Sequence, residues 1–116
     1  MRKIGMLAVL FAVGICLAEQ KTLTGYLVDK ACSADYVKKG YASAKGHDVG
    51  CAQMDDCAKS GYGVLTSDNK FVTFDAGGNK RAAAALQGTQ KKTDLQVTVT
   101  GEVSGDGIKV ATLKMN

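Results

Sequence analysis

Apolar and polar residues alternate most regularly over residues 95–103. Leu95, Val97 and Val99 are separated by polar residues, and Val103 continues the same parity. A period of two is typical of a strand with one buried face. The pattern therefore predicts a strand here, with Val97 and Val99 in the core.

Shorter alternating stretches predict four more strands. One covers 22–28, and two others, 62–67 and 70–75, flank Asp68-Asn69, a dipeptide suited to a tight hairpin turn. A fifth strand covers 108–115, where the apolar parity changes near Ala111-Thr112 and predicts a β-bulge.

Helical patterns fall between these strands. Alanine-rich residues 80–87 predict a short helix that ends at Gly88. Residues 51–60 predict another, with Asp48 able to cap its start and Gly61 suited to the position after its end. The polar stretch 29–50 lacks a sustained period and predicts a long excursion with one helical turn near residues 34–38.

The order of these elements predicts the fold. Five strands, with a helix between the third and the fourth, are the order of a small five-stranded OB-like Greek-key barrel. The fold class is mainly β with short helices, and a cysteine-bearing helical insertion lies between strands 1 and 2. A generic α+β sheet would produce the same string of elements.

The first residues have the three parts of an export signal. Arg2 and Lys3 precede an apolar run over residues 4–17, and Cys16-Leu17-Ala18 forms a small-residue exit. We therefore expect a signal peptide over residues 1–18, a single mature domain over 19–116 without a membrane span, and a secreted or periplasmic location. An uncleaved anchor and a lipoprotein modified at Cys16 are the alternatives.

Charge and composition restrict the function. Removal of Arg2 and Lys3 lowers the formal net charge from +4 to +2, which is too weak to favour nucleic acid as a partner. The single histidine, His47, lies in a cysteine-rich region and completes no Ser-His-Asp triad. We therefore expect a domain without catalytic activity.

Three cysteines, Cys32, Cys51 and Cys57, follow the expected cleavage site. Outside the cytoplasm a disulfide is the usual state of such thiols. If Cys51 and Cys57 share one helix, six residues place them too far apart to be bridged. Cys32 is therefore one partner. We expect Cys51 to be the other, because it lies at the helix start beside the loop that returns from Cys32, which leaves a spare thiol at Cys57.

A metal site is the alternative use of the same residues. Cys32, His47, Cys51 and Cys57 have the number and chemistry of ligands for zinc or copper, although no CxxC pair is present. Reactive-thiol chemistry is a further possibility for these cysteines.

Several segments together resemble one protein family. They are residues 25–32, His47, Cys51-Ala52, Cys57, residues 59–63, residues 97–101 and residues 108–110. The chain resembles a family of small secreted bacterial proteins of unknown function with a Cys…His…Cys…Cys pattern. The resemblance covers most of the mature chain and implies an exported OB-like domain, with no established activity.

The sequence thus favours an exported small domain, stapled by a disulfide, that binds an unknown envelope or extracellular partner or a small ligand. The competing hypothesis is a metal-binding or thiol-active envelope protein.

Overall fold

The structure is a computed structural model that describes residues 19–116. The predicted signal peptide lies outside the described residues. In chain order the elements are β1 (Glu19–Asp29), α1 (Lys30–Lys39), the 3-10 helix η1 (Tyr41–Gly46), α2 (Val49–Ala52), α3 (Asp55–Ser60), β2 (Tyr62–Thr66), β3 (Phe71–Phe74), α4 (Ala76–Gly88), β4 (Gln96–Ser104) and β5 (Gly107–Met115).

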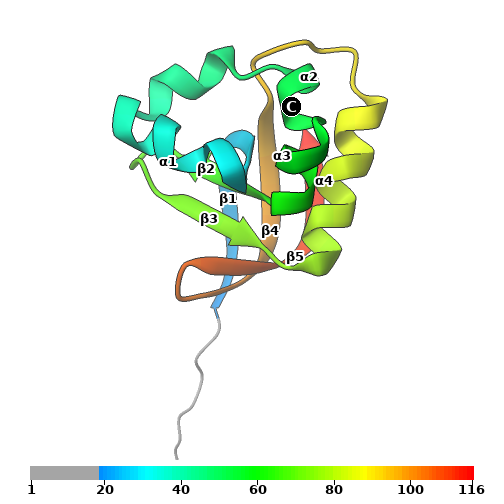
Figure 1. Cartoon of the computed structure of the whole chain (residues 1–116). Coiled ribbons are helices and arrows are strands. Elements are labelled where there is room, and N and C mark those ends of the chain that lie inside the picture. The colour runs from blue at the N-terminus through cyan, green and yellow to red at the C-terminus, as the bar shows by residue number, and fades with distance from the viewer. Residues whose placement is uncertain (1–18) are drawn as a thin grey trace, which may run out of the picture.

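The five strands close into a barrel in the order β1-β2-β3-β5-β4 (Figure 1). All neighbours are antiparallel except β3 and β5, which run parallel and join at Thr73–Gly107 and Phe74–Ile108. The helical insertion follows β1, and α4 lies between β3 and β4. The predicted OB-like barrel with a helical insertion between strands 1 and 2 is therefore confirmed.

Strand β1 belongs to both halves of the barrel. Its first part, up to Tyr26, pairs with β4, and its second part, from Gly25, pairs with β2. Gly25 lies in the overlap, where an added Cβ would collide with the Leu65 carbonyl. Only glycine therefore fits at position 25.

Two apolar clusters lie on opposite faces of β1. The larger fills the barrel and includes the predicted Val97 and Val99, both fully buried, together with Leu86 of α4. The smaller places Tyr26 and Val28 of β1 against the insertion. The end of β1 is therefore buried on both faces, which an alternating pattern does not reveal.

Helix α4 begins four residues earlier than predicted. The Asp75 Oδ1 atom accepts a hydrogen bond from Gly78 N at 3.0 Å and one from Val110 N at 3.1 Å. A Cβ at Gly78 would lie 2.5 Å from Val110 Cγ2, so glycine permits α4 to approach β5 closely. The cap and this packing extend the helix through glycines that otherwise disfavour it.

The predicted bulge is confirmed. Thr100 faces Thr112 and Gly101 faces Val110, so Ala111 is the extra residue on β5.

Two predictions about the insertion are wrong. The single helical turn near residues 34–38 is a full helix, α1, because Asp29 caps it. The helix expected over 51–60 is divided into α2 and α3, since Met54 has extended dihedrals, φ −60° and ψ 143°. The Ala52 carbonyl accepts from the Tyr62 hydroxyl at 2.8 Å, instead of continuing the helix.

Within residues 19–116, none of the helices has the length and apolar character needed to cross a bilayer.

The register of β4 can be tested by two neighbouring substitutions. Val99→Asp places a charge without a partner in the barrel core and should lower the free energy of unfolding by more than about 3 kcal/mol. Thr98→Asp, on the half-buried outer face, should lower it by less than about 1 kcal/mol. Urea unfolding of both variants measures the difference, and equal losses would contradict the register.

Candidate functional site

The side chain of Asp29 connects several parts of the insertion by hydrogen bonds. Asp29 is the last residue of β1 and the cap of α1, and its side chain is fully buried. Its Oδ2 atom accepts from Cys32 N at 3.0 Å, and its Oδ1 atom lies 2.8 Å from His47 Nε2. A buried carboxylate requires such partners, because burial without them is strongly unfavourable.

His47 connects Asp29 to α1. Its ring is 2% exposed, and its Nδ1 atom lies 3.0 Å from the Tyr36 hydroxyl. A neutral imidazole satisfies both bonds by donating from Nε2 to Asp29 and accepting from Tyr36 at Nδ1. Both ring nitrogens are thus occupied, and the structure does not place His47 among the ligand atoms where the metal hypothesis put it.

Cys32 and Cys57 meet beside Asp29. Each is the third residue of its helix, α1 or α3, and both side chains are half-buried. Their Sγ atoms and a carboxylate oxygen of Asp29 all lie within 4.8 Å of one another. Residues that are far apart in the sequence therefore bring two thiols and a carboxylate to one point.

The thiols are held in the protonated form. Burial raises the pKa of Cys32 to about 12, and the hydrogen bond and negative charge of Asp29 act in the same direction. Burial and Asp29 also raise the pKa of Cys57. Within residues 19–116 no lysine or arginine forms an ion pair with Asp29. No such cation therefore offsets the effect of the Asp29 charge on the pKa values of the two thiols.

Cys51 lies outside the close group. It is exposed near the start of α2, where its N–H donates to the capping Asp48 Oδ1 at 2.7 Å, and the charge of Asp48 raises the pKa of its thiol. Cys32, Cys51 and Cys57 are all free thiols in this structure. The predicted Cys32–Cys51 disulfide assumed one continuous helix, whereas the structure places Cys57 beside Cys32.

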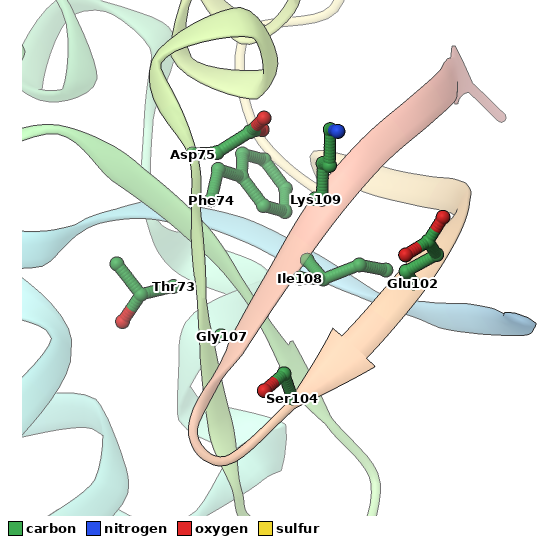
Figure 2. A pocket seen from close by; sticks show the side chains of 8 residues that line it. All are labelled: Thr73, Phe74, Asp75, Glu102, Ser104, Gly107, Ile108 and Lys109. Atoms are coloured by element: carbon green, nitrogen blue, oxygen red, sulfur yellow. The ribbon is translucent and has the colours of Figure 1, made fainter. Parts of the chain in front are cut away.

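A separate hollow opens where β3 meets the β4–β5 hairpin (Figure 2). Its volume is about 400 Å³. Figure 2 labels the eight residues that line it, among them the oppositely charged Glu102 and Lys109, which face each other in the ladder. Asp75 also lines it, but its carboxylate is engaged by α4 and β5.

No family model matches the chain, and neither the curated proteins nor the solved structures include a similar one. The resemblance to small secreted bacterial proteins stays a prediction.

Sequence reasoning missed Asp29 and Tyr36. A signal for Asp29 was present, because Asp29-x-x-Cys32 has the same spacing as Asp48-x-x-Cys51, and each aspartate caps the helix that carries its cysteine. No local pattern indicated Tyr36, since its hydroxyl meets His47 only through the folding of the insertion.

Loss of His47 should destabilise the domain more than loss of the Tyr36 hydroxyl that contacts it. His47→Ala leaves the Oδ1 atom of the buried Asp29 carboxylate without its partner and should lower the free energy of unfolding by about 3 kcal/mol or more. Tyr36→Phe removes one hydrogen bond and should lower it by about 1 kcal/mol. Chemical denaturation at neutral pH gives both values. A His47→Ala variant as stable as wild type would show that the hydrogen bonds of His47 to Asp29 and Tyr36 do not stabilise the domain.

The three thiols should differ in reactivity. In the reduced, metal-free protein, iodoacetamide should modify exposed Cys51 first and Cys32 last, because burial and the raised pKa leave little thiolate at Cys32. Mass spectrometry of quenched samples follows the order. Modification of Cys32 before Cys51 would contradict the described environment.

Proposed function

We propose that this chain is an exported binding domain without catalytic activity, whose small ligand is a transition-metal ion, zinc or copper. The observation that carries the proposal is the meeting of Asp29, Cys32 and Cys57, whose ligand atoms lie within 4.8 Å of one another. Thiolate and carboxylate are both established ligands of zinc, and thiolate also suits copper(I).

The separation of the ligand atoms suits an ion after a small adjustment. Zinc binds sulfur at about 2.3 Å and carboxylate oxygen at about 2.0–2.2 Å, so ligand atoms in a tetrahedral site lie about 3.5–3.8 Å apart. Rotation of the two half-buried cysteine side chains can provide this change. A cation would also favour deprotonation of the thiols, which otherwise face Asp29 in the protonated form.

The surroundings support a binding role. His47 orients the Asp29 carboxylate, as the outer partners of metal ligands commonly do. Its nitrogens are both engaged, so it has no free atom with which to act as a general base. Three protein ligands leave a fourth position for water.

A disulfide-stapled binding domain is the second candidate, favoured by the same proximity of Cys32 and Cys57. An exported protein meets oxidising conditions, and closing a loop of this length contributes roughly 3 kcal/mol in the chain-entropy model. The ligand would then occupy the hollow of Figure 2, because OB-folds bind ligands near strands 2 and 3 and the loop between strands 4 and 5.

Metal content and thiol titration of exported protein, collected without chelators, distinguish the candidates. One equivalent of zinc or copper with three titratable thiols after its removal supports the metal site. No metal, one thiol and a Cys32–Cys57 cross-linked peptide support the disulfide. A Cys32–Cys51 cross-linked peptide would instead support the bridge predicted from the sequence. A protein with three free thiols that binds neither added ion would overturn both candidates.

A matched pair of variants locates the metal. Cys57→Ser should abolish stoichiometric metal binding, whereas Cys51→Ser should retain the ion, since Cys51 lies outside the close group. Retention of metal by both variants would place the site elsewhere.

A further inference from the structure

Met54 occupies the break between α2 and α3, next to the proposed metal site. It lies three residues after Cys51 and three before Cys57. Its N–H donates to the Cys51 carbonyl at 3.2 Å, and its carbonyl accepts from Ala58 N at 2.8 Å. These bonds hold the Met54 backbone in a defined place between the two cysteines.

The residue type is unusual for this position. Met54 caps α3, where Ser, Thr, Asp and Asn are preferred because their side chains accept hydrogen bonds from the first turn. Met54 provides no such bond, and it is the one large apolar side chain exposed within residues 19–116, at 59%. Departures from local preference often mark functional positions.

Met54 and Cys57 share one side of the α3 start. The cap and the third helical residue lie on the same side of the first turn, and the side chain of the third residue inclines toward the helix start. Cys57 is that third residue. Met54 and Cys57 therefore lie three residues apart on one side of the α3 start, and the Cys32 thiol lies beside Cys57.

On the basis of the proposed function, we propose that the site selects copper(I), with Cys32, Cys57 and the Met54 thioether as its ligands. Thiolate and thioether sulfur are soft ligands that suit copper(I), whereas zinc gains from the harder Asp29 carboxylate. Copper(I) binding releases the two thiol protons to solvent and transfers no electron. Asp29 then keeps its bonds to His47 and to the start of α1.

Two substitutions of similar size test the role of Met54. Met54→Leu preserves volume but removes the sulfur, and Met115→Leu makes the same change on β5. Each reduced mature protein is titrated without oxygen, against copper(I) buffered by bathocuproine disulfonate and, separately, against zinc buffered by a colorimetric chelator.

Met54→Leu should weaken copper(I) binding by at least about tenfold and leave zinc binding unchanged. Met115→Leu should change neither affinity. Unchanged copper(I) affinity in Met54→Leu, or an equal loss for both ions, overturns the selectivity while leaving the metal site intact. A wild-type protein that binds neither ion overturns the proposed function itself.

Discussion

The arrangement of the insertion depends on the hydrogen bonds of the buried Asp29 carboxylate. A carboxylate without water must find donors, and the chain provides them from two directions: the first turn of α1 and the His47 ring. The first bond fixes where α1 leaves the barrel. The second brings the chain back after η1, and Tyr36 holds the far side of the ring. The thiols then meet at a point that these bonds have already defined.

Hydrogen bonds elsewhere attach the insertion to the barrel. Asn69 in the β2–β3 turn donates to the Val37 carbonyl at 2.8 Å, and Lys30 N donates to the Gly61 carbonyl at 2.8 Å. Tyr62 holds the end of α2 through its hydroxyl. These bonds attach α1 to the β2–β3 turn and to the residue that follows α3, and they attach α2 to the start of β2.

The sequence was sufficient for the barrel because strand periodicity records burial on one face, as along Val97 and Val99. The parity change at Ala111 revealed the bulge for the same reason. The insertion was harder to predict, since its helices end where tertiary bonds intervene. The Tyr62 hydroxyl, which donates to the Ala52 carbonyl, lies outside residues 51–60. No residue pattern within that segment indicates the break between α2 and α3. Asp29 was overlooked because aspartate is usually exposed, and its burial follows from contacts with the folded insertion.

The double burial of β1 has a consequence for the modularity of the domain. Tyr26 and Val28 face the insertion, while Leu27 between them faces the barrel. A chain trimmed to five strands and α4 would present a contiguous apolar surface to water. The insertion thus covers one of the two buried faces of β1, and the barrel alone would leave that face exposed. The domain should therefore tolerate replacement of Cys32 and Cys57, near the starts of α1 and α3, more readily than loss of the helices that carry them.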